Sequence, residues 1–137
     1  MADGLMRVTD SPHTVGDTLD RVEKALHERG VPVFARVDHG GGARAAGLQL
    51  GDEEVLIFGD PRVGTALMQS DPRVGYELPL RVLAWQEQGG TRLGYVPASE
   101  LAERYRLAGR EEVLAKMDTL LAQLVAEGVA AGGAQRR

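Results

Sequence analysis

The sequence predicts an α+β fold, a single small domain in which a mixed or antiparallel sheet packs against helices. Two segments with alternating apolar residues flank Gln88-Gly89-Gly90-Thr91, a pattern typical of a β-hairpin. Earlier segments alternate between strand-like and helix-like periodicity, so a doubly wound α/β fold is the second choice. A length of 137 residues fits one domain.

The first half of the chain predicts a strand, a helix, a strand and a short helix. The first strand spans 5–8, and Thr14 then caps a helix whose apolar residues recur at helical spacing. Gly30 ends this helix, in a position that glycine favours. Alternating residues predict a second strand over 31–37, and a short helix is expected over 43–46.

The second half begins with a buried strand predicted over 54–58, because Val55-Leu56-Ile57-Phe58 is a continuous apolar run. This run leads into Asp60-Pro61. Asp is a strong N-cap and Pro favours the first helical turn, so a helix is predicted over 61–69. The remaining predicted elements are hairpin strands over 80–86 and 92–96, a helical segment over 97–105 and a final helix over 110–126.

Several separated segments carry a characteristic combination of residues. They are Ser11-Pro12-His13-Thr14-Val15, Val33-Phe34-Ala35-Arg36-Val37-Asp38-His39, Leu56-Ile57-Phe58-Gly59-Asp60-Pro61, Gly64-Thr65-Ala66-Leu67-Met68, Leu78-Pro79-Leu80-Arg81-Val82-Leu83 and Gly94-Tyr95. Together they resemble the bacterial and archaeal family called domain of unknown function 302. The resemblance implies a small α+β domain that often occurs alone and assembles as a homodimer. It implies no activity.

Two positions depart from the family's usual pattern. Asp60 stands where members often carry Asn, which preserves the N-cap chemistry. Gly40-Gly41-Gly42 stands where members often have helix-forming residues, which predicts a looser loop there.

The resemblance also divides the chain into four parts. The family-like core covers 5–107, after a loose N-terminus at 1–4. An added helix over 108–127 and a flexible tail over 128–137 follow. The apolar stripe of the added helix either closes the core or packs against a second subunit.

Composition excludes several classes of function. The chain has no cysteine, which rules out disulfides, Fe–S ligation and a thiol nucleophile. Its net charge is -4 with both signs scattered, so no nucleic-acid partner is expected. No apolar stretch approaches the roughly 18 residues that span a bilayer, and no basic segment precedes an apolar run at the N-terminus. We therefore expect a cytoplasmic protein without a membrane partner.

The first candidate site pairs His13 with His39, each at the end of a predicted element. Histidine is a common general base and metal ligand, and Asp38 could orient one imidazole. The simpler interpretation is that these are surface or capping histidines. Asp38-His39-Gly40-Gly41-Gly42 could also wrap a phosphate, but it lacks the spacing of a known phosphate-binding loop.

The second candidate site is the strand-to-helix turn Gly59-Asp60-Pro61-Arg62. Free N–H groups at a helix start attract an anion, and Arg62 could add a charge-assisted contact. Against this, Asp60 would itself occupy the anion position. Met68 with His39 could ligate haem or copper, yet Met68 also fits an apolar helix stripe. Trp85 on the hairpin could line a pocket.

These residues favour a homodimeric cytoplasmic module that binds a small, anionic or partly apolar ligand between sheet and helix. The alternatives are a small enzyme that uses His13 or His39 as acid and base, or a protein-interaction subunit. No metal site is predicted. The identity of the ligand and of any cofactor stays open.

Overall fold

The computed structural model describes residues 5–132 of the chain. Its elements in chain order are β1 (Arg7–Ser11), α1 (Val15–Glu28), β2 (Val33–Asp38), α2 (His39–Ala45), β3 (Glu53–Phe58), α3 (Pro61–Ser70), η2 (Pro72–Tyr76), β4 (Leu80–Glu87), β5 (Gly90–Tyr95), η3 (Ala98–Glu103) and α4 (Glu111–Val129). The strands form one five-stranded sheet in the order β1-β5-β4-β3-β2.

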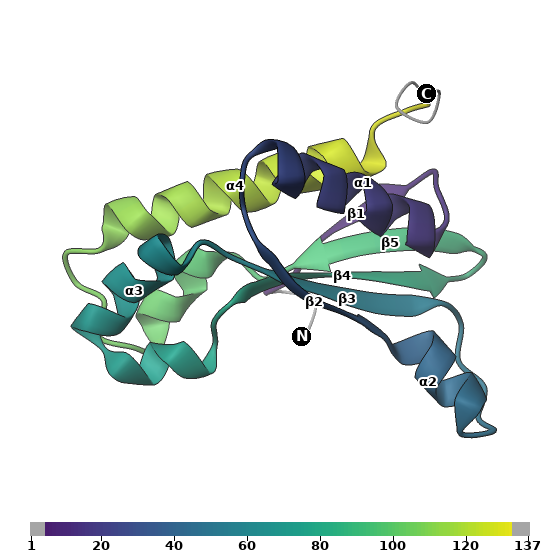
Figure 1. Ribbon diagram of the computed structural model, residues 1–137, viewed down its shortest axis with the longest axis horizontal. Coiled ribbons are helices and arrows are strands. Elements are labelled where there is room, and N and C mark those ends of the chain that lie inside the picture. The colour runs from purple at the N-terminus through teal and green to yellow at the C-terminus, as the bar shows by residue number, and fades with distance from the viewer. Residues whose placement is uncertain (1–4, 133–137) are drawn as a thin grey trace.

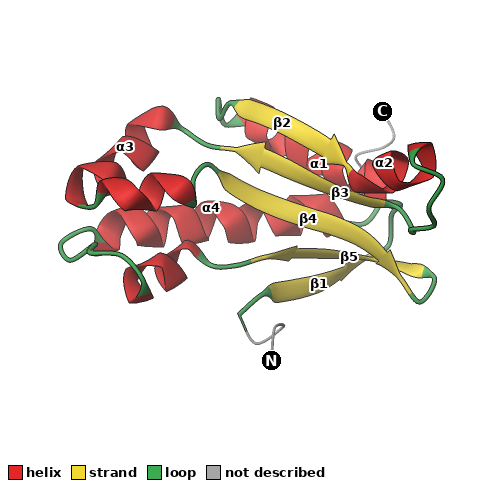
Figure 2. Ribbon diagram, turned by 90° about the horizontal axis from the view of Figure 1, so that it is seen from below, coloured by secondary structure: helices red, strands yellow, loops and turns green. Residues whose placement is uncertain are grey.

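Every neighbouring pair of strands in this sheet is antiparallel. The predicted α+β class is therefore confirmed, and the doubly wound alternative is wrong because that fold needs parallel strands. Helices α1 and α4 lie together on one face of the sheet (Figure 1). Seen from below, the strands lie in front of both helices (Figure 2).

The core lies between the sheet and the α1–α4 layer. Leu19 and Leu26 of α1 are fully buried, as are Leu56 and Phe58 of β3. Amphipathic spacing produces this: the apolar stripe of α1 faces the sheet, while its charged residues face solvent. The buried residues of α4 are Leu114, Met117, Leu121, Leu124, Val125 and Gly128.

Helix α4 thus closes the core of its own chain. This is one of the two alternatives predicted for its apolar stripe, the other being contact with a second subunit. Helix α4 also runs further than the predicted end at 126, to Val129. A Cβ atom on Gly128 would lie 2.9 Å from Cγ2 of Val22. Glycine there lets α4 approach α1 closely. Of the flexible tail predicted over 128–137, Gly128 and Val129 belong to α4. Residues 133–137, like the predicted loose N-terminus at 1–4, lie outside the described residues.

The predicted hairpin forms between β4 and β5. Its two-residue turn consists of Gln88 and Gly89, with φ angles of 53° and 80°. Positive φ at both central residues matches the right-handed twist of the strands, and glycine adopts it without strain.

The structure moves the first strand relative to its prediction at 5–8. Strand β1 ends at Ser11, which pairs with Thr91 of β5 and shares a 2.7 Å hydrogen bond with the hydroxyl of Thr18. The predicted strand ends at residue 8, three residues before Ser11. The side chain of Ser11 is buried under α1, which extends the strand by the residues just before the turn.

The predicted loose loop at Gly40-Gly41-Gly42 is wrong, because these residues belong to α2. Asp38 caps this helix, since its carboxylate accepts the N–H of Gly41 at 2.8 Å. A Cβ atom on Gly40 would lie only 2.9 Å from the carbonyl oxygen of Gly51. The glycine therefore serves close packing of α2 against the chain before β3, and the helix forms despite poor intrinsic propensity.

Candidate functional site

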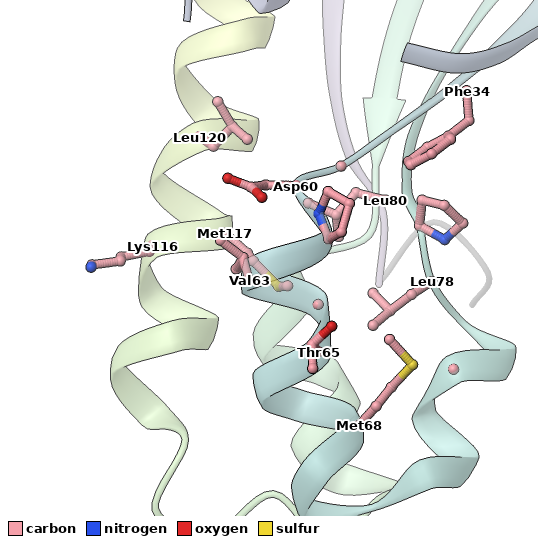
Figure 3. A pocket seen from close by; sticks show the side chains of 15 residues that line it. Phe34, Asp60, Val63, Thr65, Met68, Leu78, Leu80, Lys116, Met117 and Leu120 are labelled. Carbon is pink, nitrogen blue, oxygen red and sulfur yellow. The ribbon is translucent and has the colours of Figure 1, made fainter. Parts of the chain in front are cut away.

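A cavity of about 290 Å³ lies where α3 faces α4 beyond the end of the sheet (Figure 3). Phe34 of β2, Gly59 just after β3, Gly75 of η2 and the segment leading into β4 supply the remaining walls. The lining residues are Phe34, Gly59, Asp60, Pro61, Val63, Gly64, Thr65, Met68, Gly75, Leu78, Pro79, Leu80, Lys116, Met117 and Leu120. We call this cavity the α3–α4 pocket.

The sequence at the start of α3 builds one wall of the pocket. Asp60 caps the helix, because its carboxylate accepts the N–H of Arg62 at 2.9 Å, and Pro61 occupies the first helical turn. One turn later, a Cβ atom on Gly64 would stand 3.6 Å from Cδ1 of Leu78. The missing side chain at Gly64 therefore leaves space between α3 and the segment before β4.

The walls of the pocket are mainly apolar. The ends of the Met68 and Leu78 side chains lie next to each other beside α3 (Figure 3). Met117 contributes from α4. Methionine side chains are flexible and polarizable, so they adapt to ligands of different shape. The polar residues among the lining are Asp60, Thr65 and Lys116, and the amino group of Lys116 points away from the others (Figure 3).

The charge at the start of α3 is already balanced within the chain. The guanidinium of Arg62 contacts the Asp60 carboxylate at 3.1 Å. Hydrogen bonds from the side chain and the N–H of Arg62 lower the pKa of Asp60 below its usual value. The position where an anion would bind to the helix start is therefore occupied by a carboxylate of the protein, and Arg62 itself points to solvent and lines no part of the pocket.

The structure does not bring His13 and His39 together. His13 lines a cavity of about 260 Å³ beside the start of α1. Its Nε2 donates to the carbonyl oxygen of Ala130 at 2.7 Å. His39 is the first residue of α2, is exposed, and lies on the opposite face of the sheet in another groove. Asp38 caps α2 and makes no hydrogen bond to either histidine. The histidines therefore share no pocket.

Met68 and Trp85, the remaining predicted site residues, lie apart from the histidines and from each other. Met68 lines the α3–α4 pocket, whereas His39 lines another groove, so they do not form a haem-ligating pair. Trp85 lies outside both, and its Nε1 donates to the carboxylate of Glu87 at 2.9 Å. Of the predicted site residues, Gly59, Asp60 and Met68 line the α3–α4 pocket.

Sequence reasoning missed the wall that α4 supplies. Met117 and Leu120 belong to an apolar helix stripe, and such a stripe in a sequence predicts core packing. Only the position of these residues opposite α3 makes them pocket residues. Phe34 was also missed. It is 54% exposed although it is a large aromatic side chain. Only the structure shows that this exposed aromatic side chain lies beside an apolar cavity.

A second and wider groove of about 570 Å³ lies on the sheet face that α1 and α4 leave uncovered. Val55, Ile57 and Leu83 form its apolar floor. Among residues 5–132, no helix is long and apolar enough to cross a membrane. In the same part of the chain, no group of three or more His, Asp or Glu side chains could hold a metal ion.

The fold and the pocket define a small antiparallel α+β domain with an apolar cavity at one end of its sheet. The chain belongs to the family described as "Domain of unknown function DUF302", whose family model matches residues 7–124. The match extends beyond 107 and includes most of α4. This agrees with the burial of α4 in the core.

A solved structure has the same fold. It is titled "Crystal structure of uncharacterized conserved protein DUF302 from Bacillus stearothermophilus" and superposes with a TM-score of 0.79 at 21% identity. The superposition covers 90% of this chain and 97% of that one.

Curated relatives are longer than this chain. "Fluoride-specific ion channel FluC 1" of Brucella suis biovar 1 (strain 1330) is 42% identical over 114 residues, which cover 82% of this chain and 44% of that protein. "Fluoride-specific ion channel FluC 1" of Brucella abortus biovar 1 (strain 9-941) is also 42% identical over 114 residues, which cover 82% of this chain and 42% of that protein. The chain thus spans less than half the length of the curated relatives it matches.

Proposed function

We propose that this chain is a small-ligand-binding module whose α3–α4 pocket takes a compact, uncharged and mainly apolar molecule. The observation that carries the proposal is the pocket itself, a cavity of about 290 Å³ with apolar walls from α3, α4 and the start of β4. Ligand sites in proteins are typically apolar clefts of about 300–1,000 Å³ with a few polar groups that orient the ligand. The volume of the α3–α4 pocket is close to the lower limit of that range.

The charges around the pocket select against an anionic ligand. Asp60 lies in the lining, and its low pKa keeps it ionised at neutral pH. Arg62 pairs with Asp60 outside the pocket, so its charge does not reach a ligand inside. A neutral molecule with one hydroxyl group suits the site better, because Thr65 supplies a hydroxyl to pair with it.

The proposal includes a cytoplasmic homodimer as the working form of the module. The uncovered sheet face supports association, because it exposes apolar side chains that α1 and α4 do not cover. The match inside longer relatives supports a modular role, since the same domain occurs there as less than half of a protein. The name fluoride-specific ion channel describes those whole proteins.

A thermal-shift screen with matched pairs of compounds tests the proposal. Small neutral alcohols and phenols are compared with carboxylates of the same carbon skeleton, for example benzyl alcohol with benzoate. We expect the neutral members to raise the melting temperature and the carboxylates to raise it less, because Asp60 repels them. If neither class raises the melting temperature at millimolar concentration, the proposal fails.

A pocket-filling variant locates the binding. Gly64→Leu extends a side chain from α3 between Leu78 and Met68, whereas Gly64→Ala adds only a Cβ atom at ordinary contact distance. We expect Gly64→Leu to abolish the shift and Gly64→Ala to retain it, with circular dichroism confirming that both fold. Equal ligand shifts in both variants would place the ligand elsewhere.

A further inference from the structure

The uncovered sheet face carries an apolar row that crosses all five strands. Strand register aligns Val8, Gly94, Leu83, Val55 and Val37 as successive cross-strand neighbours. The two edge residues of this row are exposed, 39% for Val8 and 40% for Val37. A continuous apolar band of this kind on a sheet face is typical of an interaction surface.

Two opposite charges lie on either side of this row. Glu53 pairs in register with Trp85, and Ile57 pairs with Arg81, so the Val55–Leu83 pair lies midway between the two charged positions. Four residues along a strand separate Arg81 from the level of Glu53, a distance of about 13 Å at roughly 3.3 Å per residue. The two side chains therefore cannot pair within one chain.

Neither charge has another partner in the described part of the chain. Glu53 is half-buried and Arg81 is exposed, and the side chain of neither makes a hydrogen bond or ion pair with any residue of 5–132. The neighbouring acid Glu54 differs, because it points to the other face and pairs with Arg36 at 2.7 Å. An unpaired acid and an unpaired base thus stand at opposite ends of one apolar patch.

We propose that this face is the interface of the homodimer, with Arg81 of each copy paired to Glu53 of the partner subunit. In a two-fold symmetric interface, if one residue contacts a second, the second contacts the first on the other copy. A two-fold axis that lies between the two sheets and passes over the Val55–Leu83 pair exchanges the two charged positions. The strands of the two sheets then cross obliquely, as in packed sheets.

Charge favours a second copy over other occupants of this face. One acid and one base in exchangeable positions make the patch complementary to itself. An acidic membrane surface or a nucleic acid would instead favour an excess of basic residues on the patch. The wide groove on this face also offers space for side chains of the second copy, because Val55, Ile57 and Leu83 form its floor.

This inference rests on the proposed homodimer, and charge exchange tests it separately. The variants are Arg81→Glu, Glu53→Arg and the double exchange, with Lys24→Glu on the opposite, helical side as the matched control. Sedimentation equilibrium measures the dissociation constant of each. We expect each single variant to raise it about tenfold or more, because like charges then meet across the interface. The double exchange should restore it, and Lys24→Glu should leave it unchanged.

The possible failures point to different conclusions. A wild-type protein that stays monomeric over the measured range overturns both the homodimer and this interface. A stable dimer that no variant weakens overturns this interface while the homodimer stands. Weakening by the single variants without recovery in the double exchange overturns the Arg81–Glu53 pair. Ligand shifts from the α3–α4 pocket should be the same in all variants, which separates this test from that of ligand binding.

Discussion

The carboxylate of Asp71 accepts the main-chain N–H of Arg106 at 2.9 Å and so joins two segments that lie 35 positions apart. The same carboxylate accepts the N–H of Arg73 at 3.1 Å and contacts its guanidinium at 2.9 Å. Asp71 is only 4% exposed and stands directly after α3. This contact therefore holds the end of the helix that forms one wall of the α3–α4 pocket.

Replacing this carboxylate should make stability less dependent on pH. The side-chain hydrogen bond from Arg73, followed by the N–H of Arg106, lowers the pKa of Asp71 well below its usual range. A carboxyl with a lower pKa in the folded state stabilises the protein above its unfolded pKa, and this contribution disappears as the pH falls. We expect Asp71→Asn to be less stable than the wild type at neutral pH, with the difference shrinking below about pH 4.

Urea unfolding of both proteins across this pH range measures the effect. Asp52→Asn, at an exposed aspartate near α2, is the control and should show little difference at any pH. A stability difference for Asp71→Asn that stays constant down to acid pH would contradict the assignment.

A side chain at Gly128 should destabilise the fold. Its Cβ atom would come within 2.9 Å of Cγ2 of Val22 and 3.0 Å of Cδ2 of Leu93, both in the core. We expect Gly128→Ala to lower the free energy of unfolding by about 1–3 kcal/mol, as overpacking does. Gly16→Ala in α1 is the control, because its Cβ atom meets nothing within 4 Å. Equal effects in urea unfolding would mean that α4 does not pack against α1 as described.

The capping of η3 by α4 gives a third prediction. The carboxylate of Asp118 accepts the N–H groups of Ala98 and Ser99. Removing a cap of this kind typically costs about 0.5–2 kcal/mol. We therefore expect Asp118→Ala to lower the free energy of unfolding by about 1 kcal/mol, while Asp118→Asn keeps an accepting oxygen and loses less. Thermal unfolding of the two variants measures both losses of stability. A loss that is equal in both variants would contradict the capping role.

Arg36 connects β2 to α1 and β3 through three carboxylates. Its guanidinium contacts Asp20 at 2.7 Å, Glu23 at 2.8 Å and Glu54 at 2.7 Å. A lysine keeps the charge but has no planar fork that reaches all three. We expect Arg36→Lys to lower the free energy of unfolding by about 1–2 kcal/mol.

The matched control for this prediction is Arg44→Lys. Arg44 forms an exposed pair with Asp52 at 3.5 Å, and the change should alter stability by less than about 0.5 kcal/mol. If the two arginine variants were equally stable in urea, the Arg36 network would contribute nothing that a surface pair does not.

Elements with local signals could be predicted from the sequence. Asp60 followed by Pro61 marks the start of α3, and both residues act as expected in the structure. Gln88 and Gly89 mark the hairpin turn, because its positive φ angles restrict which residues fit. In these cases the residues that determine the conformation are adjacent in the chain.

Features that depend on distant contacts could not be predicted. Gly40 belongs to a helix because the chain near Gly51 approaches it, and nothing next to Gly40 in the sequence shows this. The candidate site was predicted only in part for the same reason. Its first wall follows from Asp60, but Met117 becomes a pocket residue only when α4 packs opposite α3.

Methionine methyl groups test the ligand-binding proposal most directly. Met68 and Met117 line the α3–α4 pocket from two helices, whereas Met6 lines the groove on the uncovered sheet face. In a methyl-labelled sample, we expect a neutral ligand from the screen to shift the Met68 and Met117 signals with one shared dissociation constant and to leave Met6 unchanged. A ligand that binds while shifting Met6 alone, or none of these methyl signals, would contradict the proposed site.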